Sequence, residues 1–268
     1  MIASLHIQTA ASENRTWLKS AFSTPPFKVA DITEDKKANQ LHLMLMSSSP
    51  GILDGDEYQL KIELAKGSSL QLHTQSYQRL FNMKRSASQS LEVNLAASSS
   101  FCFLPHPSVP HANSVFKSTN KIYLAENCSL VFGEILTCGR KLNGEVFLFS
   151  KYHNITQVFL QKKLIIKENL LIEPANFDPG SIGQLEGFTH QASLIYLHPS
   201  AGTKPLNELV TEYLSSQADI IFGITDAPVN GLIVRILGQK AEQLHGCLEK
   251  IAAILPQQAT IKPITHAV

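Results

Sequence analysis

Apolar residues recur at every second position through most of this chain, from its start to about residue 200. In the clearest segment, 57–64, the apolar residues are Tyr58, Leu60, Ile62 and Leu64, and polar residues stand between them. Because successive side chains of a β-strand point to opposite sides, this spacing is typical of strands with one buried face. The pattern therefore predicts a body made mainly of β-strands.

Similar short apolar segments follow along the chain, separated by turn-forming residues. They fall at 70–72, 91–95, 122–124, 130–136, 146–149 and 158–160. Asn143-Gly144 is a strong hairpin signal, because both central residues of a type I′ turn need a positive φ. It predicts antiparallel pairing between strands at 134–142 and 145–151. No internal repeat is expected, because the sequence shows none at a fixed period.

Helical spacing replaces the alternation after Pro199. Segment 205–217 places apolar residues three and four positions apart, and Pro205 suits the first turn of a helix. Two strand-like segments, 220–224 and 232–237, precede a second amphipathic helix at 241–255, which ends before Pro256. No linker divides the chain. We therefore expect one domain over 1–268, with a β-rich body at 1–200 and a mixed α/β tail at 201–268.

Composition and charge exclude several classes of protein. Only 17% of the 268 residues are charged, and the formal net charge is +1, so the chain lacks the field that would attract a nucleic acid. The longest apolar runs are shorter than the roughly 18 residues that a membrane-spanning helix needs. The first residues lack the basic and apolar regions of a signal peptide. We therefore expect a cytoplasmic protein with neither nucleic acid nor membrane as a partner.

Motifs of nucleotide, nucleophile and redox chemistry are incomplete. Residues 139–145 imitate the start of a phosphate-binding loop, but Glu145 stands where a lysine is required and would repel phosphate. The Ser181 segment, 180–183, is too short for a nucleophile elbow. The four cysteines include no Cys-x-x-Cys pair and are too few for a disulfide scaffold. They are predicted to be reduced thiols in the core.

Two segments are candidates for contacts with a cation. His106 and His111 flank a proline-rich turn, but no thiolate or carboxylate stands beside them, so a structural loop is the favoured interpretation. Residues 54–57 place three carboxylates on a glycine turn, but Ala65 stands where a calcium loop needs its last acid. A solvated turn is the favoured interpretation of this segment, and a transient cation contact is the alternative.

Glu134 lies inside an apolar predicted strand, and Arg140 follows shortly after it. We expect a buried or half-buried ion pair between the two, with a role of Glu134 in guiding an ion as the alternative. No self-contained catalytic constellation is present, so a binding or assembly role is favoured. An enzyme acting on carbohydrate would use paired acids such as Asp56 and Glu134, but a single Trp17 argues against an aromatic-lined cleft. A plain interaction module without a metal role is a further alternative.

Five segments also carry motifs whose order and spacing are more specific than any one of them. They are FSTPPFKV at 22–29, SSSPGILDGDEYQL at 47–60, LHTQSYQRLF at 72–81, FLPHPSVPHANS at 103–114 and LVFGEILTCGRKLNGEVF at 130–147. The matching positions are Pro25-Pro26, Pro50-Gly51, Gly55-Asp56, Thr74-Gln75, Arg79-Leu80-Phe81, the loop from Leu104 and Pro105 to Pro110, and Glu134, Gly139, Arg140, Gly144 and Glu145. Together they resemble the UreD family of urease accessory proteins, called UreH in some organisms. Asp54 departs from that family, which often has a small residue there.

The resemblance implies a mainly β fold of stacked antiparallel or β-helix-like strands, with two helices in the C-terminal part. It implies a urease maturation factor that is not an enzyme and that links the urease apoprotein to UreF and the GTPase UreG, as a dimer of heterodimers. No tightly bound cofactor is implied, but Ni²⁺ would pass through an internal channel. Candidate residues on this path are Asp54, Asp56, Glu57 and Glu134. Structural roles are expected for Gly55, Thr74, Gln75, Pro105, Gly139, Arg140, Gly144 and Glu145.

Overall fold

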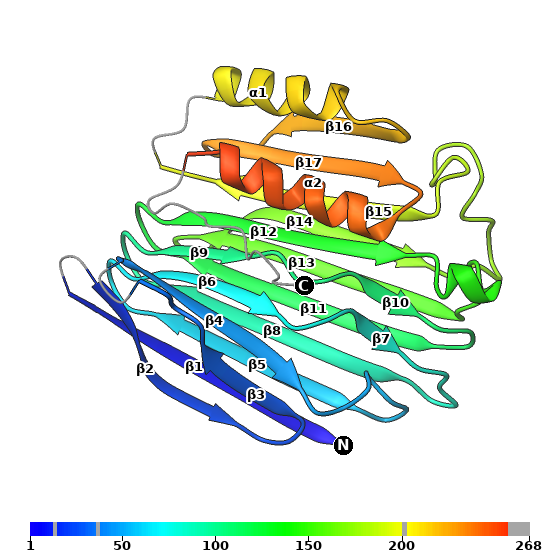
Figure 1. The fold of residues 1–268 in the computed structure, drawn as a ribbon, viewed down its shortest axis with the longest axis horizontal. Helices are drawn as coiled ribbons and strands as arrows, with labels where there is room; N and C mark the ends of the chain where they lie inside the picture. The colour runs from blue at the N-terminus through cyan, green and yellow to red at the C-terminus, as the bar shows by residue number, and fades with distance from the viewer. Residues whose placement is uncertain (13–14, 36–37, 200–202, 257–268) are drawn as a thin grey trace.

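Two stacked β-sheets and two helices make up the computed structural model, which describes residues 1–12, 15–35, 38–199 and 203–256 (Figure 1). Within these residues the first sheet has seven strands, in the spatial order β14 (Lys163–Ile172), β13 (Lys151–Leu160), β11 (Val115–Leu124), β8 (Ala87–Leu95), β5 (Glu57–Leu64), β1 (Ile2–Ser12) and β2 (Arg15–Ser23). The second sheet follows the order β16 (Ile220–Asp226), β17 (Gly231–Gly238), β15 (His190–Leu197), β12 (Ser129–Thr137), β9 (Ser100–Phe103), β6 (Ser69–Thr74), β4 (Gln40–Ser47) and β3 (Phe27–Asp31). Two short strands, β7 (Gln78–Leu80) and β10 (Ser108–Pro110), pair beside it. The prediction of a mainly β fold is confirmed.

The chain alternates between the two sheets in its central part, so that consecutive strands stack as coils. β5, β8, β11 and β13 pair in parallel in the first sheet, and β4, β6, β9 and β12 pair in parallel in the second. Antiparallel pairs lie at the margins, as in β1 with β2 and β15 with β17. This arrangement is similar to the expected β-helix, although parallel pairing dominates its centre.

The coils contain a sequence repeat in their turns. The three turns from the first sheet to the second are Leu-Ala-Lys-Gly-Ser-Ser at 64–69, Leu-Ala-Ala-Ser-Ser-Ser at 95–100 and Leu-Ala-Glu-Asn-Cys-Ser at 124–129. They recur at intervals of about 30 residues, a period typical of repeat architectures. Gly67, Ser98 and Asn127 occupy the same place in each turn, with φ of 72°, 58° and 55°. The expectation of no repeat is therefore wrong, and we call this series the turn stack.

The core lies between the sheets and is built from rows of side chains in register. One row runs through Ile7, Ile62, Val93, Ile122 and Val158, all fully buried. Parallel, in-register coils place equivalent side chains directly above one another, so each row packs as a continuous apolar column. The alternation in the sequence thus predicts correctly which residues form this core.

Two helices cover the outer face of the second sheet, where a second core forms (Figure 1). α1 (Thr203–Ser215) and α2 (Ala241–Ile254) confirm the predicted helices with small shifts of their ends. α2 buries Leu244, Cys247, Leu248, Ile251 and Ala252. The predicted strands at 220–224 and 232–237 are confirmed as β16 and β17, which extend the second sheet beyond β15.

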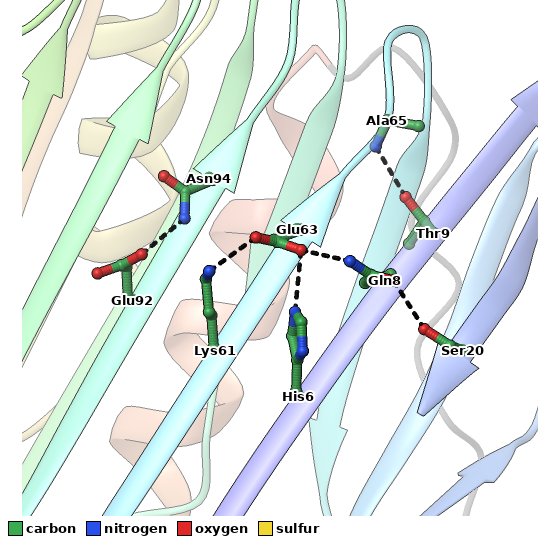
Figure 2. Close-up of polar contacts among 9 residues, drawn as sticks. All are labelled: His6, Gln8, Thr9, Ser20, Lys61, Glu63, Ala65, Glu92 and Asn94. Carbon is green, nitrogen blue, oxygen red and sulfur yellow. Dashed lines mark hydrogen bonds and ion pairs between the residues drawn. The ribbon is translucent and has the colours of Figure 1, made fainter. Parts of the chain in front are cut away.

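The outer face of the first sheet is polar instead (Figure 2). The carboxylate of Glu63 accepts a hydrogen bond from Gln8 Nε2 at 2.6 Å, contacts Lys61 Nζ at 2.8 Å and hydrogen-bonds His6 Nε2 at 2.9 Å. These contacts, led by the Gln8 hydrogen bond, lower the pKa of Glu63 to about 2. The carboxylate is therefore ionised, as suits a solvent-facing sheet.

The hairpin expected at Asn143-Gly144 is absent from the described residues. β12 ends at Thr137 and pairs with β9 and β15, while the segment expected as a strand at 146–149 forms none. Gly144 does take the predicted positive φ, 79°, but it caps the short 3₁₀ helix η1 (Lys141–Asn143). The positive φ predicted for Gly144 is confirmed, but the residue ends a helical turn and not a hairpin.

Candidate functional site

A strip of polar side chains interrupts the apolar interior near the end of the coil stack. One row of the first sheet runs in register through Leu5, Leu60, Leu91, Asn120, Thr156 and Glu168. It thus changes from leucine to polar residues between β8 and β11. The facing row of the second sheet runs through Glu134, Ser193 and Arg235. Burying polar groups costs free energy unless they are hydrogen-bonded, so the residues of this strip are expected to hydrogen-bond one another or a bound group.

Glu134 is the centre of the strip. Its carboxylate accepts hydrogen bonds from Asn120 Nδ2 at 2.8 Å, from Asn154 Nδ2 at 2.9 Å and from Thr156 Oγ1 at 2.9 Å. Burial raises the pKa of Glu134 to about 7 despite these three hydrogen bonds, which favour the ionised form. The group is therefore poised to change its charge near neutral pH.

Two cavities meet at Glu134. The larger, of about 150 Å³, extends from exposed residues of two loops, including Pro50 and Gln75, inward to Glu134. The smaller, of about 30 Å³, continues from Glu134 to Glu168, in the edge strand of the first sheet, and to Ser193 in the second sheet. Both are also lined by Tyr152 and Asn154, from β13. Glu134 is half-buried and belongs to the lining of both cavities, so its side chain borders the interior space.

The expectation of an ion pair between Glu134 and Arg140 is wrong. Arg140 pairs with Glu145, through a 2.8 Å bond from Nε to Oε2 and a second bond from Nη2 to Oε1. β12 ends before Arg140, so this side chain leaves the interior with the loop, while Glu134 keeps its neutral partners. The error came from extending the strand too far.

The other acids of the predicted nickel path lie outside both cavities. Asp56 is buried, accepts a bond from Leu53 N at 2.9 Å and pairs with the terminal amine of Met1 at 3.0 Å. Asp54 accepts a bond from Arg85 N at 2.9 Å, and the exposed Glu57 accepts one from Gln59 Nε2. Of the four acids named from the sequence, only Glu134 lines either of the two cavities. Asp56 and Glu134 therefore do not share a site, as paired glycosidase acids would.

Three of the motif residues expected to have structural roles line the larger cavity, namely Thr74, Gln75 and Pro105. Thr74 Oγ1 accepts a bond from His106 N and contacts His106 Nδ1, both at 2.9 Å. Thr74 thereby holds the Leu-Pro loop at the cavity wall. His106 also stacks on His245 of α2, with ring centroids 4.9 Å apart. His111 instead packs edge-on against Phe81, so the two histidines of the loop do not converge.

The remaining motif residues shape two turns. Gly139 has φ of 119°, and a Cβ there would lie 2.9 Å from Pro110 O and 3.0 Å from Glu145 O. Gly55 has φ of 80° and lies against the Arg85 guanidinium. The motif that ends in Gly144 and Glu145 is thus a loop closed by the Arg140 ion pair, and Glu145 has no phosphate-loop role in it.

Sequence inspection missed Asn120, Asn154, Thr156 and Glu168. A signal for them exists, because each polar residue stands at an inward position of a strand that also carries apolar residues on that face. In β11, Ser118 and Asn120 precede Ile122 and Leu124 on the buried face. Recognising this exception required the strand register that the coils supply.

The described part of the chain holds no group of three or more His, Cys, Asp or Glu side chains arranged to bind a metal ion. Its cysteines are unpaired and buried, as predicted for Cys102, Cys128, Cys138 and Cys247. Neither described helix is long and apolar enough to cross a membrane.

Comparisons with known proteins agree with the motifs. A family model described as UreD urease accessory protein matches residues 1–266. A urease accessory protein UreD from Flavobacterium johnsoniae is 50% identical over 252 residues, which are 94% of this chain and 91% of that relative. Relatives of the same description from Acetivibrio thermocellus and Haemophilus influenzae are 33% and 35% identical, covering 94% and 91% of this chain and 96% and 95% of their own lengths. This chain belongs to the UreD family of urease accessory proteins.

Proposed function

We propose that this protein is a non-catalytic maturation factor that acts in the cytoplasm and conducts Ni²⁺ through its interior to the urease apoprotein. It would join that apoprotein to UreF and the GTPase UreG, as a dimer of heterodimers. The observation that carries the proposal is the polar strip around Glu134, at which two cavities meet. Family membership supports the role in urease maturation.

The chemistry of Glu134 suits a cation in transit. With a pKa near 7 the carboxyl exchanges readily between its neutral and ionised forms, and an approaching divalent cation favours the ionised form. The amide and hydroxyl groups around it are uncharged. Conduction needs a site that binds the ion strongly enough for it to enter and weakly enough for it to leave. A single carboxylate meets this need better than a full set of ligands does.

The substitution Glu134→Gln tests the proposal, because it removes the charge and keeps nearly the same volume. Glu63→Gln is a matched control, since Glu63 is also a hydrogen-bonded carboxylate but lies on the outer face of the first sheet (Figure 2). Each variant would be produced together with urease and its other accessory proteins. We expect urease from cells with Glu134→Gln to contain severalfold less nickel and to be less active, while Glu63→Gln matches the wild type.

Complex formation separates conduction from assembly. A sizing column should show that Glu134→Gln still binds UreF and UreG, because the substitution lies inside the β body. Full nickel loading of urease by this variant would refute the passage and leave the plain interaction module. Loss of the complex would mean that Glu134 supports the fold rather than the ion.

A further inference from the structure

An ion pair between the two sheets lies at Glu168, a residue that lines the smaller cavity. Arg235 Nη2 lies 2.7 Å from Glu168 Oε1 and 2.6 Å from Glu168 Oε2. The Arg235 side chain is 52% exposed and the Glu168 side chain 24% exposed. Glu168 itself lines the cavity. The pair therefore lies between the interior and the solvent.

Strand order explains why a closure is needed at this place. β14 is the edge of the first sheet, whereas the second sheet continues from β15 to β17 and β16. The space between the sheets therefore loses one wall beyond β14. Glu168 is the last residue of the inward row in the first sheet, and Arg235 continues the row of Glu134 and Ser193 in the second. The two side chains meet across this open margin.

We propose that Arg235 is a gate that closes the interior cavity at the β14 margin and opens when its ion pair with Glu168 breaks. The inference rests on the proposed function only in assigning the cavity to Ni²⁺. While the gate is closed, the guanidinium places a fixed positive charge in front of the cavity and repels cations. When it opens, Glu168 becomes a free carboxylate near Glu134, and this pair of acids attracts a cation.

The exposure of Arg235 makes the gate easy to open. Ion pairs in contact with water are weak, because water screens the charges and the long side chains lose entropy on pairing. Opening therefore requires no rearrangement of the sheets. Glu168 and Arg235 are attached to β14 and β17, whose backbones stay in place, so the same ion pair can form again.

The accessibility of an introduced thiol measures the gate directly, without urease. Ser193→Cys places a thiol in the wall of the smaller cavity, and the four native cysteines are buried. The labelling rate with a small cationic methanethiosulfonate would be compared with and without Arg235→Met. We expect the second substitution to accelerate labelling about fivefold, the factor that corresponds to about 1 kcal/mol for an exposed ion pair. The labelling rate of a neutral reagent of similar size should rise less on Arg235→Met, because the guanidinium does not repel that reagent.

Two further variants distinguish a gate from a structural clamp. Lys151→Met breaks the ion pair of Lys151 with Glu173, which also ties the hairpin of β13 and β14 but lies outside the cavity lining. It should leave labelling of the Ser193→Cys thiol unchanged. Arg235→Lys retains the positive charge and should keep labelling by the cationic reagent slow. Equal labelling with and without Arg235→Met would refute the gate, as would an equal acceleration by Lys151→Met.

The outcome is independent of the nickel test. If Glu134→Gln leaves urease fully loaded but Arg235→Met accelerates labelling, the gate stands and the nickel passage fails. If Glu134→Gln lowers nickel loading but labelling is unaffected by Arg235→Met, the passage stands without this gate.

Discussion

Glu134 shows how one buried side chain links stability to pH. A carboxyl whose pKa is raised in the folded state binds more protons folded than unfolded between its two pKa values. For Glu134 this window runs from the ordinary 4.5 to about 7. The folded protein therefore loses stability as pH rises through the window, and the loss is complete above it.

We expect Glu134→Gln to gain stability relative to the wild type as pH rises from 5 to 8. The gain should approach about 3 kcal/mol, because each unit of pKa shift corresponds to about 1.4 kcal/mol. Denaturant unfolding at both pH values measures it. Glu63→Gln should show no such trend between pH 5 and 8, since the lowered pKa of Glu63 affects stability only as pH falls from about 4.5 toward 2. If the difference in unfolding free energy between Glu134→Gln and the wild type were the same at both pH values, the pKa of Glu134 would not be raised in the folded protein.

Two glycines with positive φ offer a second test at the scale of the residue. Gly67→Ala adds a Cβ that meets no atom within 4 Å, so only backbone strain of about 1 kcal/mol is expected. Gly139→Ala adds similar strain and also places its Cβ against two carbonyl oxygens. We expect Gly139→Ala to lower the free energy of unfolding by at least about 2 kcal/mol. Equal losses would show that the loop yields to the added methyl group.

At the scale of the element, alternation predicts strands well because each strand has one face in the core. It cannot predict which strands pair. The turn stack escaped notice because only Leu-Ala and a serine recur in its turns, while the residue with positive φ changes from Gly67 to Ser98 and Asn127. Hydrogen bonds between backbones, such as Ala96 N to Leu64 O at 3.1 Å and Ala125 N to Leu95 O at 3.0 Å, hold the stack together. Backbone contacts of this kind leave little trace in a sequence.

The interior site is harder to predict than the strands for the same reason. Glu134 is an acid in an apolar strand of the second sheet, but its hydrogen-bond partners come from β11 and β13 of the first sheet. The nearest cation in sequence, Arg140, was the natural candidate. Only the pairing of the coils shows that Asn120 and Thr156 lie opposite Glu134 and that Arg140 does not.

The motif loop at 139–145 is expected to tolerate loss of its ion pair. The side chain of Arg140 is 43% exposed and that of Glu145 16% exposed. Because an exposed pair contributes little, Arg140→Ala should lower the free energy of unfolding by no more than about 1 kcal/mol. Thermal or denaturant unfolding would measure it, with Arg85→Ala as a comparison at another exposed ion pair. A loss of several kcal/mol would show that the pair holds more than its own loop.

At the scale of the whole molecule, the tail is continuous with the body. β17 pairs with β15 along its length, and the helices bury the apolar outer face of the second sheet, including Val131, Leu194 and Tyr196. Removal of residues 200–268 would expose this face to water. We expect the truncated chain to aggregate, because large apolar patches are rarely tolerated on soluble proteins.

Truncation after Pro256 is the control, since it keeps every described element. Sizing chromatography and circular dichroism would compare the two shortened proteins. A monomeric, folded chain that ends at Pro199 would show that the β body is independent of its tail. The expected aggregation would also mean that such a truncation cannot locate a binding surface for UreF.

The turn stack also determines where a lineage of such proteins can change its length. One residue gained or lost within a coil would turn every later side chain of that strand to the other face, moving polar groups such as Lys61 into the core. The register of the turn stack therefore disfavours changes in the length of a coil. Loops at the opposite end of the strands, such as 173–189, are not bound by this register and extend beyond the sheets (Figure 1). Insertions should accumulate there, where Ile182 is already fully exposed, so relatives will differ most in length at the end of the molecule that lacks the stack.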